Sequence, residues 1–282
     1  MTLSLPLNVL GASVGSHKQV IDARWLMAYA AGLGETDPRY FDTTTAPGPL
    51  AHPLFAVCYE WPLAVELRET VIGGAIAPFS VHATHDLVIH RPARAGDELS
   101  STATIVEVRP IKAGSLVVVK LDTVDERGAP VTTTHYGSIY RGVGCDDRGG
   151  GRGQAPALQE ESGPVRWEER VEVGAGLAHV YTECARIWNP IHTDVAVARR
   201  AGLPGLILHG TATLALAVSR VVRRDLTGDP ARVRGVAIRF TGMVPLPSTI
   251  VIRARDASPK GIHFDAVDAA GRPVLERGVI RR

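Results

Sequence analysis

The spacing of apolar residues predicts two helices in the first part of the chain. From residue 23 to residue 34 they recur at intervals of three and four, and Asp22 stands before them as a candidate N-cap. Residues 54–74 form a longer apolar block, which we interpret as a central helix. Pro62 lies inside this block and, because proline has no amide hydrogen, it should kink the helix or end its first part.

The period then changes to one that is typical of strands. Four segments rich in Val, Ile and Thr follow, separated by turn-forming sequences, and they predict an antiparallel meander. These segments are residues 80–92, 98–110, 115–128 and 130–142.

The second half of the chain repeats this order. It contains a strand-like segment, two short helix-like segments, a long apolar block and four further strand-like segments, at residues 164–173, 183–188, 195–202, 206–226, 233–244, 248–256, 261–271 and 273–282. A helix laid across an antiparallel sheet, made twice, is the simplest interpretation and predicts an α+β fold. Two similar sheets can pair edge to edge into one continuous sheet, which hides the edges that each would otherwise expose.

A glycine-rich, polar stretch separates the two halves. Residues 144–163 contain little that could be buried, so we place a linker there. This divides the chain into an N-terminal repeat, residues 1–143, and a C-terminal repeat, residues 164–282.

Composition and charge exclude several classes of partner. The chain is 45% hydrophobic and 21% charged, which is ordinary for a globular protein. The formal net charge of +2 is too balanced for a surface that tracks nucleic-acid phosphates. The longest apolar stretches fall short of the ~20 residues that span a bilayer, and the first residues lack a basic region ahead of an apolar block. We therefore expect neither nucleic acid nor membrane as a partner, and a cytoplasmic location.

The candidate chemistry is concentrated in one run of the C-terminal repeat, Trp188-Asn189-Pro190-Ile191-His192. Proline after asparagine favours an extended approach to a rigid turn, from which His192 would be presented. Gly210 begins a long helix-like segment, where a backbone N–H with no side chain in its way can meet an oxygen that gains negative charge. A proton relay and a stabilised enolate suit the addition of water to a double bond conjugated to a thioester, or its loss.

His209-Gly210 follows this run, and Gly210 lies 18 residues after His192. The run and the His-Gly pair together resemble the MaoC-like (R)-specific enoyl-CoA hydratases, whose motif reads approximately S-G-D-x-N-P-L-H followed by A-H-G-M. The resemblance covers most of the chain and implies a double hotdog fold: two repeats, each with a sheet wrapped around a long helix. It also implies acyl-CoA or acyl-carrier-protein thioesters as substrates and no metal or redox cofactor. By motif position, His192 corresponds to the catalytic histidine, Asn189 to the motif asparagine and Gly210 to the oxyanion donor. We expect Trp188, His209 and Thr211 to contact the substrate.

The chain departs from the family's motif at its aspartate. That position is Ile187 here, and isoleucine cannot hold or move a proton. The N-terminal repeat has a carboxylate, Glu35, at the corresponding position, but Tyr40 in place of histidine. Loss of one member of an acid–base pair commonly removes about 10²–10⁴-fold of rate. The candidates for a substitute are Glu183, Asp194, Tyr181, Glu35 and Asp37.

Several residues also have structural interpretations. His192 could be a loop histidine bonded to backbone, Asn189 could serve to pin the loop, and His209 could pack or cap. Cys184 could be a nucleophile, although Cys58, Cys145 and Cys184 are more simply reduced thiols without a disulfide or a zinc motif. On a regular strand His82 and His90 share a face and His85 points to the other, which argues against a histidine metal site. Two arginines that follow the motif, Arg199 and Arg200, could meet CoA phosphates or form a solvated helix face.

We therefore predict a hydratase or dehydratase that interconverts trans-2-enoyl and (R)-3-hydroxyacyl thioesters. Two alternatives stay open at this point. One is another hotdog enzyme, a thioesterase or a tailoring isomerase or cyclase that needs one base, and the other is a non-catalytic acyl-binding subunit. A homodimer is compatible with either.

Overall fold

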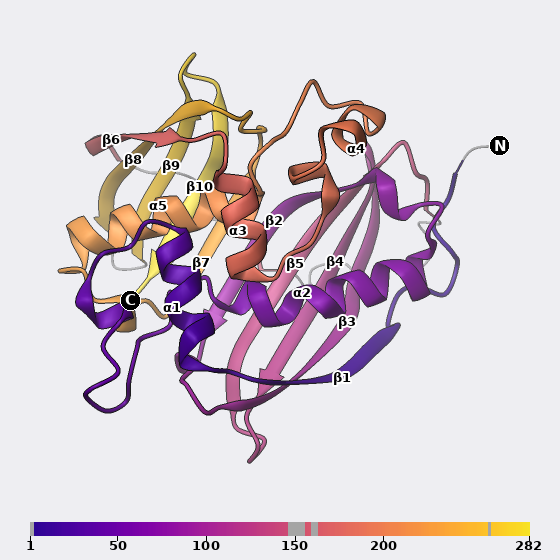
Figure 1. The fold of residues 1–282 in the computed structure, drawn as a ribbon. Coiled ribbons are helices and arrows are strands. Elements are labelled where there is room, and N and C mark those ends of the chain that lie inside the picture. Colours follow the sequence, from indigo (N-terminus) through magenta and orange to yellow (C-terminus); the bar gives the residue numbers. More distant parts are fainter. Residues whose placement is uncertain (1–2, 146–155, 159–162, 259–260) are drawn as a thin grey trace.

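A computed structural model describes residues 3–145, 156–158, 163–258 and 261–282 (Figure 1). Most of the predicted linker lies outside these residues. In the part of the chain that the structure describes, the strands form a single sheet of ten, in the order β1-β3-β4-β5-β2-β7-β10-β9-β8-β6. The first five belong to the first half of the chain and the other five to the second, so the two sheets join edge to edge, as the sequence predicts.

The first half builds one side of this sheet. Its strands are β1 (Ser13–Val20), β2 (Ser80–Ile89), β3 (Glu98–Ile111), β4 (Gly114–Val124) and β5 (Pro130–Arg141), and its helices are α1 (Ala23–Gly32) and α2 (Ala56–Leu67). Asp22 caps α1 by accepting a hydrogen bond from the amide of Trp25 at 2.7 Å, which confirms that prediction. The long helix α2 lies across the strands in Figure 1 and buries most of its apolar residues against them.

The second half repeats the arrangement. Its strands are β6 (Val165–Val173), β7 (Gly235–Phe240), β8 (Ser248–Ser258), β9 (Gly261–Asp268) and β10 (Pro273–Arg281), and its helices are α3 (Leu177–Ala185), α4 (Val195–Arg200) and α5 (Gly210–Asp225). Helix α5 covers this half of the sheet as α2 covers the other (Figure 1). A long helix on an antiparallel sheet, made twice and fused at one edge, is the double hotdog fold.

The seam between the halves is the pairing of β2 with β7. These strands run antiparallel, with Thr84 opposite Arg239 and Val88 opposite Gly235. One buried apolar cluster extends across the seam and includes residues of α1, α2, α3 and α5. A continuous core of this kind couples the two halves mechanically, because closely packed interiors transmit displacements between neighbouring elements.

Three local features differ from the sequence prediction. Of the two outcomes expected at Pro62, a kink or an end, the end does not occur, because helix α2 continues through this residue. Strand β1 has no counterpart in the prediction, because its residues are mostly polar and exposed and show no apolar alternation. The strand is held in place by its hydrogen-bonded pairing with β3. The short helix predicted at 183–188 lies earlier, at α3, and ends before Arg186, which has a left-handed backbone conformation with φ of 57°.

No helix of the described residues is both long and apolar enough to cross a membrane.

Candidate active site

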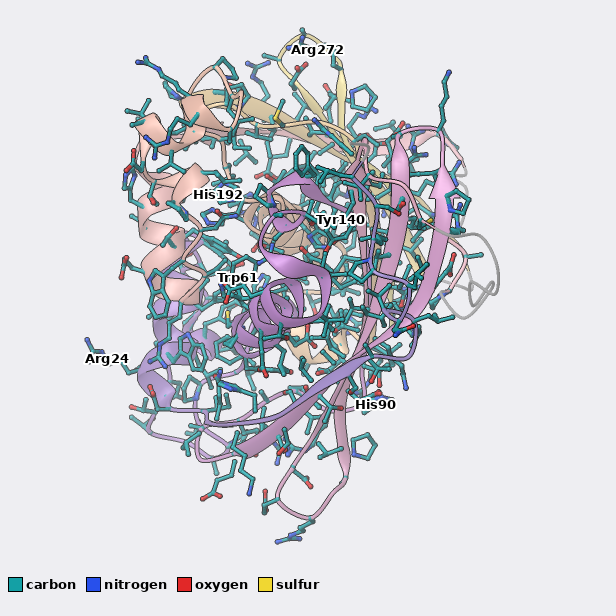
Figure 2. The ribbon with its side chains drawn as sticks, turned by 90° about the vertical axis from the view of Figure 1, so that its right-hand side faces the viewer. Arg24, Trp61, His90, Tyr140, His192 and Arg272 are labelled. Carbon is teal, nitrogen blue, oxygen red and sulfur yellow. The ribbon has the colours of Figure 1, made fainter. Side chains whose placement is uncertain are left out.

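A cavity of about 590 Å³ lies between the two long helices and the middle of the sheet. Residues of α2, β2, β4 and β5 line it from the first half, and residues of the Asn-Pro-Ile-His turn, the start of α5 and β7 line it from the second. His192 and Trp61, labelled in Figure 2, both belong to its wall. Such a volume lies in the range of small-molecule sites, and its position at the seam means that both halves shape it.

His192 ends a short 3₁₀ turn, Pro190–His192, that Asn189 begins. Its Nδ1 lies 2.9 Å from the carbonyl oxygen of Ile207. Because a carbonyl only accepts, Nδ1 carries the hydrogen, which leaves a lone pair on Nε2 of the neutral ring. Burial lowers the pKa of His192 to about 4, against the smaller opposing effect of the Ile207 carbonyl. At neutral pH the side chain is therefore an unprotonated base.

His209 stacks on His192, with ring centroids 3.7 Å apart and ring planes inclined by 27°. Its Nε2 lies 3.2 Å from the hydroxyl of Thr182 on α3. Burial, and next the neighbouring His192, lower the pKa of His209 to about 2. The stacked pair therefore resists a positive charge, and His209, which lines the cavity as well, packs against the ring of His192.

The first residue of α5 is Gly210, and it lies in the same wall. A Cβ atom at this position would approach the ring of Phe240 to 3.2 Å, so only glycine fits without displacing that ring. The amide groups at the start of a helix have no partners within the helix and lie at the positive end of its dipole. Thr211 follows and also lines the cavity, and its hydroxyl accepts a hydrogen bond of 3.1 Å from Tyr181.

The other motif residues divide between the cavity and the surface. Asn189 lines the cavity, and its side-chain oxygen accepts a hydrogen bond of 3.4 Å from the amide of Ile191, so it orders the turn. Ile187 is buried and lines the cavity as well. Trp188 is 62% exposed and is not among the lining residues, which corrects the expectation that it contacts the substrate. Neighbouring residues of an extended segment point in opposite directions, so the inward Ile187 turns Trp188 outward.

None of the carboxylates that the sequence offers as substitutes for aspartate lines the cavity. Glu183 is exposed, Asp194 caps α4, and Asp37 pairs with Arg39. The cavity instead contains Glu60 of α2, which is absent from the candidates predicted from the sequence. The sequence feature that could have indicated Glu60 is its charge within an otherwise apolar stretch of the predicted helix.

Glu60 is buried and accepts a hydrogen bond of 2.7 Å from the hydroxyl of Thr134 on β5. Burial raises its pKa to about 8, and the Thr134 and Thr132 hydroxyls oppose this rise only in part. The side chain is therefore mostly a neutral carboxylic acid at pH 7, able to donate as well as to accept a hydrogen bond.

The histidines of β2 do not follow the regular alternation expected of a strand. The pairing of β2 with β5 shifts by one residue between His82 and Thr84, and this bulge turns both His82 and His85 toward the cavity, with ring centroids 5.5 Å apart. His90 bonds to the hydroxyl of Thr133 instead. Within the described ranges, no group of three or more His, Cys, Asp or Glu is arranged to hold a metal ion.

The remaining alternatives lie away from the cavity wall. Cys184 is half-buried, does not line the cavity, and burial raises the pKa of its thiol, which disfavours the nucleophilic thiolate. Arg199 and Arg200 lie in the last turn of α4 with exposed side chains, as in a solvated helix face.

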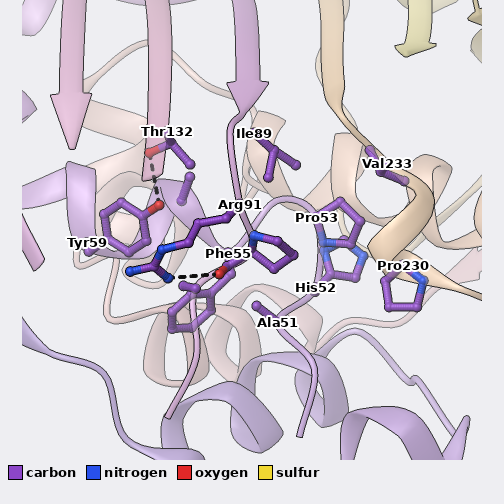
Figure 3. Close-up of a pocket in the computed structure, with 13 residues that line it drawn as sticks. Ala51, His52, Pro53, Phe55, Tyr59, Ile89, Arg91, Thr132, Pro230 and Val233 are labelled. Carbon is purple, nitrogen blue, oxygen red and sulfur yellow. Dashed lines mark hydrogen bonds between the residues drawn. The ribbon is translucent and has the colours of Figure 1, made fainter. Parts of the chain in front are cut away.

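The first half contains a counterpart of the histidine pair. The 3₁₀ turn Pro38–Tyr40 begins at Asp37, and the ring of Tyr40 lies 6.1 Å from that of His52. The residue after His52 is Pro53, which has no amide hydrogen to offer an oxygen. His52 and Pro53 line a cavity of only about 20 Å³. Figure 3 shows these residues in close-up. At the corresponding positions this half has Tyr40 where the other has His192 and Pro53 where the other has Gly210, beside a much smaller cavity.

Comparison with known proteins agrees with this architecture. Residues 162–274 match the family described as MaoC like domain, and residues 8–134 match the family described as FAS1-like, dehydratase domain region. The 3-hydroxyacyl-thioester dehydratase Y of Mycobacterium tuberculosis is 30% identical over 57% of this chain and 56% of its own length. The peroxisomal enoyl-CoA hydratase 2 of Arabidopsis thaliana is 36% identical over 23% of this chain and 21% of its own.

The solved structure of a MaoC-like dehydratase from Phytophthora capsici has the same fold. It superposes with a TM-score of 0.82 and 22% identity, over 98% of this chain and 96% of that one. The two curated relatives are matched over only 56% and 21% of their lengths. The fold defines a double hotdog protein. Its residues 162–274 are similar to the MaoC like domain, and its residues 8–134 are similar to the FAS1-like, dehydratase domain region.

Proposed function

We propose that this protein adds water to trans-2-enoyl thioesters, or removes it from (R)-3-hydroxyacyl thioesters. The observation that carries the proposal is the presence of an unprotonated His192 and the start of α5 at Gly210 in the wall of one cavity. The names of the relatives, a 3-hydroxyacyl-thioester dehydratase and an enoyl-CoA hydratase, support this class of reaction. The proposal holds for either carrier, CoA or acyl-carrier protein.

In the hydration direction, His192 acts as the base. As the water oxygen attacks C3 of the enoyl group, Nε2 accepts a proton from that water and electrons move from the double bond toward the thioester oxygen. The amide of Gly210 and the positive end of the α5 dipole stabilise the resulting enolate. The protonated His192 then delivers its proton to C2, which completes the addition of H and OH and regenerates the neutral ring.

This scheme uses one residue for both proton transfers, because the motif's aspartate position is Ile187. A base with a pKa near 4 abstracts a proton from water less readily than one matched to the working pH. The expected turnover is therefore slower than that of an enzyme with a histidine–aspartate pair, by about 10²-fold or more.

The direct test is to incubate the purified protein with crotonyl-CoA and longer enoyl-CoAs and to follow the loss of the absorbance of the conjugated double bond. We expect turnover that His192→Ala abolishes. His179→Ala is the matched control, because His179 is an exposed histidine whose Nε2 lies 3.1 Å from the carbonyl oxygen of Thr193, outside the cavity wall. No turnover at any chain length would reject the proposal.

A second candidate, a non-catalytic acyl-binding subunit, is favoured by Ile187 alone. It predicts that acyl-CoA raises the melting temperature of the protein without turnover. A thioesterase would instead release free thiol from acyl-CoA. The cytoplasmic location and the homodimer stay predictions.

A further inference from the structure

The bulge in β2 gives the cavity a polar wall that the hydration of an alkyl enoyl thioester does not require. His82 and His85 both face the cavity because the pairing with β5 shifts between His82 and Thr84. The ring of His82 stacks on Tyr136 of β5, with centroids 3.9 Å apart, and lies 4.4 Å from the ring of Phe240. We call His82, His85 and Tyr136 the β2 recess.

The recess is separated from the start of α5 by one aromatic ring. Phe240 approaches His82 on one side, and on the other its ring lies 3.2 Å from where a Cβ of Gly210 would be. A thioester whose carbonyl oxygen meets the Gly210 amide therefore has the recess within reach of its acyl chain.

His85 is the unusual member of the recess. It is 1% exposed, and neither of its ring nitrogens has a hydrogen-bond partner among the described residues. His82, by contrast, has its Nε2 3.1 Å from the carbonyl oxygen of Thr84. A buried polar group without a partner is costly, and apolar residues of the same shape would avoid this cost. An imidazole that faces a cavity under these conditions suits a ligand that supplies the partner.

The two imidazoles of the recess and the carboxyl group of Glu60 are largely uncharged at neutral pH, although Arg68 and Arg141 also line the cavity. Burial lowers the pKa of His85 to about 4 and holds that of His82 well below its ordinary value, and burial raises the pKa of Glu60 to about 8. Asp86, next to His85 in the chain, opposes the shift at His85 only in part. The cationic Arg68 is held over the ring of Trp61, 4.7 Å from its centroid. A neutral imidazole offers one donor and one acceptor, which is the complement of a hydroxyl group.

We propose that the β2 recess binds a hydroxyl group on the acyl chain, so that the preferred ligands are hydroxylated acyl thioesters and not plain alkyl ones. This inference rests on the proposed function for the placement of the thioester head. His85 supplies the donor and the acceptor, and the stacked pair of His82 and Tyr136 fixes the shape of the site around it.

The test uses ligands that cannot react, so its outcome is separate from that of the hydratase assay. The probes are saturated CoA thioethers that carry a 2-oxodecyl chain, either plain or with one hydroxyl at a carbon between the fifth and the ninth. Isothermal titration calorimetry gives Kd for each. We expect at least one hydroxylated probe to bind about tenfold or more tightly than the plain one, as one buried hydrogen bond would give.

The matched variants are His85→Phe, on β2 and in the cavity wall, and His90→Phe, on the residue that directly follows β2 and outside the cavity wall. In His85→Phe the preference should collapse toward equal binding, while the melting temperature stays or rises because a buried unpartnered group is gone. His90→Phe should keep the preference. If circular dichroism shows that His85→Phe does not fold, the smaller His85→Leu carries the same test.

Equal binding of all probes by the native protein, a preference for the plain probe, binding of none, or a preference that survives in His85→Phe would each overturn the proposal. A clear preference for a hydroxylated probe in a protein without hydratase turnover would retain the recess and reject only the reaction.

Discussion

Arg281 of β10 is paired with Asp86 of β2 across the seam between the two halves. Its Nη2 donates to Oδ1 at 2.7 Å and its Nη1 to Oδ2 at 3.1 Å, while Nη2 also donates to the carbonyl of Leu87 at 2.8 Å. The Arg281 side chain passes over β7 at Gly235, where a Cβ would come within 2.5 Å of it. The glycine at position 235 of β7 thus leaves room for side chains of β2 and β10, the strands on either side of β7, to meet.

Arg281→Met should destabilise the protein, because the carboxylate of Asp86 is only 7% exposed and would lose its partner. We expect a loss of roughly 3 kcal/mol of unfolding free energy, measured by urea denaturation. Arg282→Met, which changes an exposed arginine next to it, is the control. The double variant Arg281→Met with Asp86→Leu should recover much of the loss, and purely additive effects would contradict the pairing.

Gly210→Pro should remove the proposed oxyanion donor while leaving the helix start intact, since proline is well accepted at the first helical position. We expect kcat to fall about 10²–10³-fold. Gly210→Ala keeps the amide hydrogen and adds only the contact with Phe240, so it separates the two effects. Equal losses in both variants would show that space, and not the N–H group, matters at this position.

The pH profile of kcat/KM should reflect the low pKa of His192. Because its neutral form is the base, activity requires a pH above its pKa, which burial lowers to about 4. We expect kcat/KM to stay level from pH 8 down to about pH 5. A fall of kcat/KM centred near pH 6.5, the ordinary pKa of histidine, would show that burial does not lower the pKa of His192.

Glu60 should make the protein less stable as the pH rises. Its pKa is about 8 in the folded state against 4.5 ordinarily, so between these values the folded state holds one proton more than the unfolded chain. The unfolding free energy then decreases with rising pH, by up to about 1.4 kcal/mol per unit.

Glu60→Gln should remove this decrease and stabilise the protein at pH 8, measured by denaturation between pH 5 and 8. Glu66→Gln, an exposed glutamate on the same helix, should leave the slope unchanged. Identical slopes in the native protein and Glu60→Gln would refute a raised pKa at Glu60.

Ile187→Asp should place a carboxylate in the cavity wall, at the position that the resemblance described above aligns with the motif aspartate. If the rate is limited because His192 must carry out both proton transfers, we expect kcat for enoyl-CoA hydration to rise about tenfold or more. Ile187→Asn, which has nearly the shape of aspartate without its charge, is the control. A rise in both variants would point to polarity or space instead of a second proton carrier.

The sequence predicts the architecture well because the apolar spacing changes between helices and strands in both halves. Strand β1 leaves no such pattern, because its mostly exposed residues obtain their order from pairing with β3. The passage of α2 through Pro62 is equally a tertiary effect, since burial of the helix outweighs one missing hydrogen bond.

The site is only partly predictable for the same reason. The motif locates His192, Asn189 and Gly210, because their spacing survives in the sequence, but it does not reveal which side chains lie opposite them. Glu60 reaches the cavity from the other half, and His85 does so only because a bulge reverses its face. Gly137, paired with Thr84 beside that bulge, is the one local signal of the irregularity that the sequence contains.

Pro53 gives the duplicated scaffold a direction. A fold built from two similar halves could in principle seat an elongated ligand in either of two opposite orientations. Because Pro53 has no amide hydrogen, the donor proposed at Gly210 has no equivalent at the corresponding position of the first half, and the proposed site would hold the thioester head in one orientation only.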